Sequence, residues 1–336
     1  MTQNNLTIFA TEMILLRNDS TDPFFNMAFD ACCLERLPLG EPVCYLWRNR
    51  PSVIIGLNQN IYAEVNLPFL KSRGILLARR VTGGGAVYHD LQNLNYTIVG
   101  RSSDIERDYP GYAGIMADAL RTLGVNAVLS GRNDILVDGK KVSGYAKRVW
   151  KDRLIVHGTL MYDVDTETLA QALSVNGSKF EAKGIASHHS PVTNLKTYLD
   201  GIGSVLELKD ALEKILGNAH PAEPEEEFLA AVRMLAEEKF SSWEWVYGHS
   251  PASSIKRRVK TECGTVEAAM QIEKGVISRL EFTGDFIGDL PSDRVSEALE
   301  GCRLEESALR ERMKEIPVHR YFDSMTEDGL ISLLLS

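Results

Sequence analysis

Helix-type and strand-type segments alternate irregularly along this chain, and their order restricts the folds it can adopt. Runs rich in β-branched and aromatic residues occur at 44–49, 52–58, 74–81, 86–89 and 94–100. They lack the regular strand–helix–strand order of a dinucleotide-binding fold, and no GxGxxG segment is present. We therefore expect a mixed α+β fold.

Local capping and turn signals predict several individual elements. Thr21–Pro23 combines a capping side chain with a proline suited to a first helical turn, so a helix should begin there. Gly124 should end a later helix. Asp138–Gly139 and Lys274–Gly275 each separate two β-type runs and therefore predict two hairpins.

The length of the chain predicts two domains. Its 336 residues exceed the roughly 100–200 residues of a typical domain. Residues 248–254 are rich in Gly, Ser and Pro and indicate a linker. We expect a large mixed-sheet domain over 1–247 and a small α+β domain over 255–336, which contains a hairpin and two or three short helices.

Charge and composition exclude several classes of function. The formal net charge is −9, so attraction to nucleic acid or to an anionic membrane is not expected. No apolar run approaches the roughly 18–20 residues of a membrane span, and the N-terminus lacks the features of a signal or transit peptide. Five scattered cysteines without a CxxC pair favour reduced thiols, so we expect a cytoplasmic protein.

The densest chemical signal is the segment 79–90, RRVTGGGAVYHD. Three consecutive glycines permit positive φ and let backbone N–H groups approach a ligand closely. A hairpin turn would explain the glycines equally well, but Arg79, Arg80 and Thr82 beside them favour an anion-binding loop. A Walker-type phosphate loop is excluded because GxxxxGK[ST] does not occur.

A second signal lies in residues 131–148. Six of the 14 residues from 140 to 153 are basic and one is acidic, which reverses the overall charge locally. A solvated surface hairpin is one interpretation of these lysines. However, Lys141, Ser143 and Lys147 should alternate onto one face of the expected strand, which favours a binding surface.

Three further positions carry weaker signals. Asn133 and Asp134 offer oxygen ligands for a hard cation such as Mg²⁺, the usual companion of phosphates. His157 stands within an expected strand, where a histidine is more often a hydrogen-bonded core residue than a catalyst. The pair His188–His189 lacks a third metal ligand at convincing spacing. The residues alone therefore indicate nucleotide phosphate chemistry.

In combination, these segments resemble the lipoate–protein ligase A family, in the superfamily that also contains biotin protein ligases and octanoyl transferases. The resemblance covers nearly the whole chain and lies in eight segments in the family's order: TDPFFNMAFD, LWRNRPSVIIGLNQN, RRVTGGGAVYHD, GRNDI, GKKVSGYA, VHGTL, AKGIAS and VTNL. It implies a mixed-sheet catalytic domain of the biotin/lipoyl ligase type with a small accessory domain.

The resemblance also implies an activity. Members of the family use ATP to convert lipoate into lipoyl-AMP with release of pyrophosphate. They then transfer the lipoyl group to one lysine of a carrier domain. The implied cofactors are ATP and Mg²⁺. The implied carriers are lipoyl domains of 2-oxoacid dehydrogenase E2 subunits or the glycine-cleavage H protein.

Individual residues acquire roles from the same resemblance. Lys141, in the KxSG motif, would contact the acyl carboxylate and the α-phosphate as a point charge. Asp134 would serve as the Mg²⁺ ligand. The implied substrate-binding residues are Trp47, Arg80, Thr82, Gly83, Gly84, Gly85, His89, Arg148 and His157. The implied nucleotide-binding residues are Ala86, Val87, Tyr88, Asn133, Asp134, Lys183, Gly184 and Ser187.

The chain departs from the family pattern at two places and leaves two alternative functions open. Gln92 stands where the family usually has glycine, and SHHSPVTNL at 187–195 lacks the arginines that many members carry before VTNL. If those arginines bind nucleotide, this chain binds ATP weakly or uses a preformed acyl-adenylate. The alternatives are a cysteine-dependent acyl transferase and a non-catalytic lipoate or adenylate binder. No cysteine lies between Cys44 and Cys263, so only Cys44, near Trp47, could supply the transferase thiol.

Overall fold

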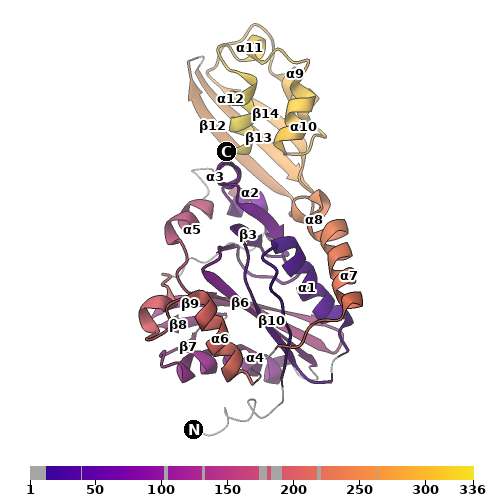
Figure 1. Cartoon of the computed structure of the whole chain (residues 1–336). Helices are drawn as coiled ribbons and strands as arrows, with labels where there is room; N and C mark the ends of the chain where they lie inside the picture. The colour runs from indigo at the N-terminus through magenta and orange to yellow at the C-terminus, as the bar shows by residue number, and fades with distance from the viewer. Residues whose placement is uncertain are drawn as a thin grey trace.

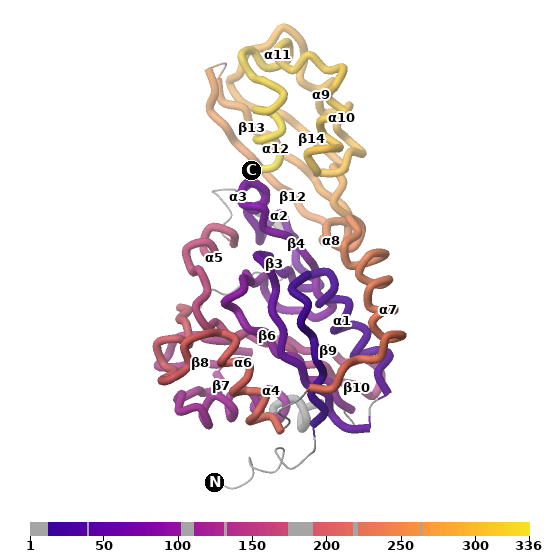
Figure 2. Tube along the Cα trace, in the orientation of Figure 1, coloured from indigo at the N-terminus to yellow at the C-terminus, as the bar shows by residue number. Residues whose placement is uncertain are grey.

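A computed structural model describes residues 13–38, 40–101, 105–130, 133–173, 180–182, 191–217, 221–262 and 264–336. These residues form a larger part built on two sheets and a smaller C-terminal part that stacks on one end of it (Figure 1). The C-terminus returns to the joint between the two parts, where α12 (Glu327–Leu335) meets α3 (Leu67–Arg73) (Figure 2).

A seven-stranded sheet is the main element of the larger part. Its neighbouring strands are antiparallel except at one edge, where β1 and β2 are parallel. This mixed sheet confirms the expected α+β class. In spatial order the strands are β1 (Ile14–Leu15), β2 (Val43–Trp47), β6 (Asn93–Arg101), β10 (Arg153–Met161), β9 (Lys140–Trp150), β8 (Asp134–Val137) and β7 (Val128–Ser130).

A second sheet of three strands and a set of helices complete the larger part. The sheet contains β4 (Leu76–Arg79), β3 (Ser52–Ile55) and β5 (Val87–His89) in that order, with β3 parallel to β4 and antiparallel to β5. The other helical elements are α1 (Pro23–Arg36), α2 (Ile61–Glu64), α4 (Ile105–Thr122), α5 (Thr166–Ala172), η2 (Leu195–Tyr198), α6 (Val205–Ile215), α7 (Glu226–Leu235), η3 (Ala236–Phe240) and α8 (Trp243–Val246). Across the described ranges, no helix is both long and apolar enough to cross a membrane.

Side-chain alternation gives the two faces of the large sheet different partners. In β6, Leu94, Tyr96 and Ile98 pack in a core with α4 and α6. Asn95 and Thr97 point to the opposite face, where Thr97 donates a hydrogen bond to a carboxylate on α1. Both residues are buried although they are polar. This face therefore combines an apolar core with a polar region.

The C-terminal part is also α+β. Its antiparallel strands are β12 (Ser253–Thr261), β13 (Gly264–Glu273) and β14 (Val276–Gly284), and β11 (Phe180–Ala182) pairs with β12 at the edge. Its described helices are α9 (Asp293–Leu299), α10 (Glu306–Met313), α11 (Val318–Tyr321) and the terminal α12. These are four helices instead of the expected two or three, because α11 is too short to show a helical period. The domain limits at 247 and 255 stay predictions.

The helix and the two hairpins predicted from capping and turn residues are present in the structure. Asp22 caps α1 by accepting hydrogen bonds from the N–H groups of Phe24 and Phe25. Asp138–Gly139 has φ values of 49° and 74°, and Lys274–Gly275 has φ values of 52° and 75°. Two successive positive φ values are typical of type I′ hairpin turns, so both predicted hairpins are confirmed.

Arg79, at the end of β4, joins the two parts of the molecule. Its fully buried guanidinium donates to three carbonyls of the turn 56–59 on one side. On the other side it donates to the carbonyls of Trp245 and Val246 and to the hydroxyl of Ser250. The sequence predicts that Arg79 belongs to an anion-binding loop. In the structure it instead holds the chain that leads into the C-terminal part.

Replacing Arg79 by Met should lower the free energy of unfolding by about 3 kcal/mol or more, since several buried carbonyls would lose their donor. Urea unfolding measures this change. The control is Arg233→Met, which removes an exposed arginine paired with Glu226 and should cost less than about 0.5 kcal/mol. An Arg79 effect as small as that of the control would show that the joint does not depend on this side chain.

Candidate functional site

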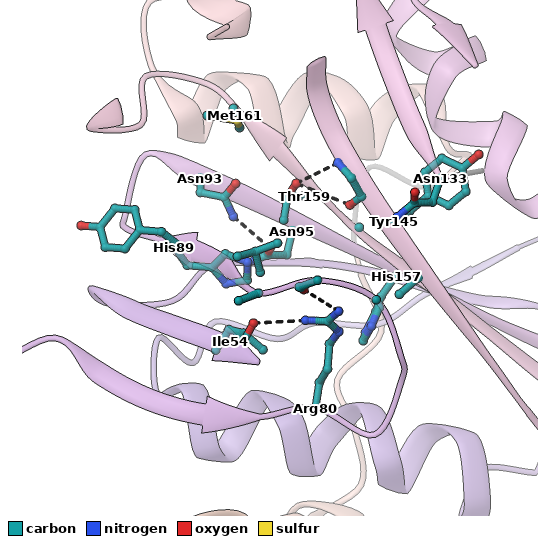
Figure 3. Close-up of a pocket in the computed structure, with 18 of the residues that line it drawn as sticks. Ile54, Arg80, His89, Asn93, Asn95, Asn133, Tyr145, His157, Thr159 and Met161 are labelled. Atoms are coloured by element: carbon teal, nitrogen blue, oxygen red, sulfur yellow. Dashed lines mark hydrogen bonds between the residues drawn. The ribbon is translucent and has the colours of Figure 1, made fainter. Parts of the chain in front are cut away.

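A cavity of about 430 Å³ lies between the two sheets of the larger part (Figure 3). Strands β2, β6, β8, β9 and β10 of one sheet and β3 and β5 of the other contribute to its wall, together with α1 and α5. The volume is typical of a small-molecule site. The candidate residues that line it are Trp47, Arg80, Gly84, Gly85, Ala86, Val87, Tyr88, His89, Asn133, Asp134, Lys141 and His157.

Three further candidates that the structure describes, Thr82, Gly83 and Arg148, are not part of this wall. Thr82 hydrogen-bonds to His157, and the carbonyl of Gly83 accepts from Arg80, so both contact residues of the wall. Arg148 donates to the carbonyl of Val81, next to the glycine loop. The candidates outside the described residues are Lys183, Gly184 and Ser187.

Arg80 shapes the glycine loop from within. Its buried guanidinium donates to the carbonyls of Gly83 at 2.6 Å, Gly85 at 2.8 Å and Ile54 at 3.1 Å. Burial, with the nearby charge of Arg79, lowers the pKa of Arg80 to about 10, so the group stays charged at neutral pH. Because its hydrogen-bond partners are neutral, Arg80 adds positive potential under the loop, which favours an anionic ligand.

Two glycines permit the close packing of this loop. Gly84 has a φ of 93°, which residues with a Cβ rarely adopt. A Cβ on Gly56 would lie 2.1 Å from the carbonyl oxygen of Gly84. Both positions therefore require glycine for the loop to reach the edge of the cavity.

A β-bulge in β9 directs Lys141 to the cavity. The register with β8 skips Val142, which is the extra residue of the bulge. As a result Lys141 and Gly144 both line the cavity, whereas Ser143 is fully buried outside it. The expectation that Lys141, Ser143 and Lys147 share one face is therefore wrong, because that alternation assumed a regular strand.

Lys141 forms an ion pair at the cavity wall. Its Nζ lies 2.7 Å from Oδ1 of Asp134, and both side chains are about one-fifth exposed, 22% and 20%. The backbone of Lys141 pairs with residues 191–193, so this segment runs beside it. The ion pair localises the ammonium as a point charge in the cavity.

The residues beside Lys141 fit a cation that arrives with phosphate. Asn133 and Asp134 line the same wall and offer amide and carboxylate oxygens. Within the ranges that the structure covers, no group of three His, Cys, Asp or Glu side chains could hold a metal ion by itself. Mg²⁺ commonly binds through one or two carboxylates plus substrate phosphates, and this donor set fits that mode.

A chain of buried hydrogen bonds next to the cavity was not anticipated from sequence. His157 Nδ1 lies 2.6 Å from Oδ2 of Asp30, and its Nε2 lies 2.6 Å from Oγ1 of Thr82. Tyr45 donates its hydroxyl to the other oxygen of Asp30 at 2.6 Å. His157 is thus both hydrogen-bonded in the core and part of the cavity wall. Asp30 could have been identified from the sequence, because it is the one charged residue in the otherwise apolar run 27–34.

The described cysteines do not reach the cavity. Cys44 is fully buried in the core that contains α4 and α6, and burial raises its pKa to about 12. Burial also raises the pKa of Cys32 to about 11 and that of its neighbour Cys33. Low-pKa, accessible thiols are the reactive ones, so these cysteines do not support a thioester mechanism.

Gln92 causes no strain in the turn where the family usually has glycine. It is exposed, and it is absent from the described residues with positive φ. Its carbonyl accepts a hydrogen bond from the N–H of Tyr162. A side chain is therefore tolerated at this position.

His89 is a neutral N–H donor in the cavity wall. The amide Nδ2 of Asn49 lies 3.1 Å from His89 Nδ1 and donates to it, so the ring proton resides on Nε2. Burial, together with the charges of Arg80 and His157, lowers the pKa of His89 to about 3.

This low pKa makes stability depend on pH. The unfolded chain protonates His89 below about pH 6.5, whereas the folded chain does so only near pH 3, so stability falls as the pH drops through this window. Between about pH 7 and about pH 5, the wild type should lose roughly 2 kcal/mol more than His89→Gln. Urea unfolding at both pH values measures the difference. His319→Gln, at an exposed position on α11, should retain the wild-type slope, and an equal slope in His89→Gln would contradict the assignment.

Comparison with known proteins places both parts of the chain in one family. The family model for the lipoyl protein ligase A/B catalytic domain matches residues 22–217. A second model, for the bacterial lipoate protein ligase C-terminus, matches residues 250–334. These matches confirm the resemblance derived from the eight sequence segments.

Two relatives are similar over nearly their full length. The lipoate-protein ligase LplJ of Bacillus subtilis is 32% identical over 330 residues, which cover 96% of this chain and 100% of that protein. Lipoate–protein ligase 1 of Staphylococcus aureus is 35% identical over 321 residues, which cover 94% and 98%.

Solved structures share the fold. A lipoate-protein ligase A bound with ATP has a TM-score of 0.61 and 28% identity, and the match covers 71% of this chain and 99% of that one. A putative lipoate protein ligase of Thermoplasma acidophilum with bound lipoic acid has the same score and identity, with coverage of 70% and 99%. A structure of a bi-partite ligase and its E2 lipoyl domain from that archaeon also scores 0.61 at 28% identity, covering 71% and 97%. The chain described here therefore belongs to the lipoate–protein ligase family.

Proposed function

We propose that this chain is an ATP-dependent lipoate–protein ligase. The observation that carries the proposal is the shared cavity of the glycine loop and Lys141, which brings positive charge and a glycine-rich backbone to one cavity wall. Solved relatives described with bound ATP and with bound lipoic acid support both ligands.

The reaction needs activation because a free carboxylate is a poor acyl donor. In the first step a carboxylate oxygen of lipoate attacks the α-phosphorus of ATP, so that lipoyl-AMP forms and pyrophosphate leaves. In the second step the ε-amine of a carrier lysine attacks the acyl carbonyl, the amide forms, AMP leaves and the amine loses a proton. Both steps increase the negative charge on oxygens, which fixed cations and N–H donors stabilise.

Lys141 and the glycine loop supply that stabilisation. Lys141 contacts the acyl carboxylate and the α-phosphate as a point charge. Backbone N–H groups near Gly84 and Gly85 approach the phosphates because no Cβ shields them. Arg80 adds positive potential from beneath the loop, and residues 86–88 continue the nucleotide side of the site.

The acyl chain of lipoate lies in the less polar part of the cavity. Met27, Ile54 and Leu169 contribute apolar walls, and Trp47 provides an aromatic one. An apolar slot with a few polar groups is the usual design of a small-molecule site. His157, fixed by its two hydrogen bonds, keeps the wall beside the glycine loop rigid.

Asp134 and Asn133 would hold Mg²⁺ together with phosphate oxygens. When bound, the ion would neutralise charge on the departing pyrophosphate. Because Asp134 also pairs with Lys141, it keeps the ammonium close to the phosphates. In this proposal Lys183, Gly184 and Ser187 form part of the adenylate loop.

The acceptor is a lipoyl domain of a 2-oxoacid dehydrogenase E2 subunit or the H protein. An E2 lipoyl domain accompanies the ligase in one solved relative. On the surface of this chain, Lys140, Lys147 and Lys151 are exposed along β9 and its turn, and they suit an acidic carrier. A cytoplasmic location agrees with the reduced cysteines expected from sequence.

The decisive measurement is pyrophosphate release from ATP, Mg²⁺ and lipoate without a carrier. We expect release by the wild type, and a mass gain on the carrier lysine when a lipoyl domain is added. Lys141→Ala should reduce the carrier-free rate by at least about a hundredfold, because charge stabilisation of the transferring oxygens is lost.

Its matched control is Lys214→Ala, which removes an exposed lysine on α6 and should release pyrophosphate at the wild-type rate. Lipoyl transfer without any pyrophosphate release would favour a transferase with a preformed donor. Binding of lipoate with neither release nor transfer would favour a passive binder. A normal rate in Lys141→Ala would remove that residue from the mechanism.

Docking of the carrier should depend on ionic strength. Raising salt from about 0.05 M to about 0.5 M should lower kcat/KM for the carrier several-fold, while carrier-free pyrophosphate release changes little. Lys140→Glu should also lower kcat/KM for the carrier, whereas Lys214→Glu, on α6, should leave kcat/KM for the carrier unchanged. Carrier acylation that is insensitive to salt would contradict a basic docking surface.

A further inference from the structure

The cavity wall contains a group of buried polar atoms without partners. His89, Asn93 and Asn95, called here the far-end cluster, are 3%, 1% and 1% exposed, and all three line the cavity. In the part of the chain that the structure describes, His89 Nε2, Asn93 Oδ1 and Asn95 Nδ2 have no hydrogen-bond partner. Buried polar groups are normally paired, so these three atoms indicate a ligand that can bond to them.

The hydrogen bonds that do exist determine what the cluster offers. Asn49 donates to His89 Nδ1, which leaves the proton of His89 on Nε2. Asn93 Nδ2 donates to Asn95 Oδ1 at 2.9 Å. The amide N–H groups of Asn95 and the side-chain carbonyl of Asn93 therefore remain to bond to a ligand. The far-end cluster therefore presents N–H donors from two residues and one carbonyl to the cavity.

The cluster lies opposite the reactive end. A row across the large sheet runs from Asn95 on β6 through Thr159 on β10 and Gly144 on β9 to Asp134 on β8. Three strand spacings separate its ends by roughly 14 Å. Figure 3 shows the same arrangement, with His89, Asn93 and Asn95 on one side of Thr159 and Asn133 on the other. A carboxylate held by Lys141 therefore directs the tail of the acid to the cluster.

The ring of lipoate matches these donors better than a plain alkyl tail does. Its two sulfur atoms are weak hydrogen-bond acceptors, whereas the methyl end of octanoate accepts nothing and would leave the N–H groups unpaired. Trp47, the cross-strand neighbour of Asn95, provides an aromatic surface at the same end, with its ring 6.2 Å from that of His89.

We infer that His89 and Asn95 recognise the dithiolane sulfurs, so that this site selects lipoate over unsubstituted medium-chain acids. The inference rests on the proposed function, since it assumes that the carboxylate lies at Lys141. It assigns to the far-end cluster a role in substrate specificity, separate from the charge stabilisation at the other end.

The test compares lipoate, octanoate and 5-cyclopentylpentanoate, which has the shape of lipoate without sulfur. With the full chain, kcat/KM for carrier-free pyrophosphate release should favour lipoate over the cyclopentyl acid about tenfold, the factor expected for one weak buried hydrogen bond. Asn95→Leu should reduce this ratio to about twofold or less. Equal use of lipoate and the cyclopentyl acid by the wild type would overturn the inference, whether or not the variant folds.

The matched control is Ser52→Ala. Ser52 pairs with His89 in the β3–β5 register and also has a buried oxygen without a partner among the described residues, but it does not line the cavity. This variant should keep the wild-type ratio. Calorimetric binding of the three acids without ATP should give the same order, so a failure of the ATP-dependent reaction is distinguished from a failure of sulfur recognition. An unchanged lipoate preference in Asn95→Leu would also contradict the inference.

Discussion

Two adjacent arginines at the end of β4 determine both the joint and the site. Side chains of successive residues in extended backbone point in opposite directions, and Arg80 directly follows β4 and still donates its N–H to the carbonyl of Ile55. Arg79 therefore reaches the chain that enters the C-terminal part, and Arg80 reaches the glycine loop. Both guanidiniums are buried, and neutral backbone carbonyls accept most of their hydrogen bonds. The positions of the C-terminal part and of the loop are thus set by two consecutive residues, the last residue of β4 and the one that follows it.

The same arrangement explains how an acidic protein builds a site for anions. The net charge of the chain is −9, yet Arg80 and Lys141 lie in one cavity wall. Arg80 bonds to carbonyls and keeps its charge, and Lys141 is held by a single carboxylate. Local geometry therefore decides the potential that a bound phosphate experiences, and the overall charge mainly affects encounters at the surface.

Much of the fold could be predicted because its signals are local. Asp22 caps α1 through its own side chain, and the turn at Asp138–Gly139 requires only two residues with positive φ. The face of Lys141 could not be predicted in this way. It depends on the bulge at Val142, which arises from pairing between two strands and not from any residue type. Asp30 was missed for a similar reason, since its partner His157 is 127 positions away.

The sequence by itself determined the fold class, the hairpins and the family, because cap, turn and motif signals act over a few neighbouring positions. Only the tertiary structure decided which of two adjacent arginines lines the cavity, and that three polar side chains meet at one end of it. These outcomes depend on burial and on contacts between distant segments. A polar residue becomes a structural link, a source of positive potential or an unpaired group in a cavity wall according to what the folded chain packs against it.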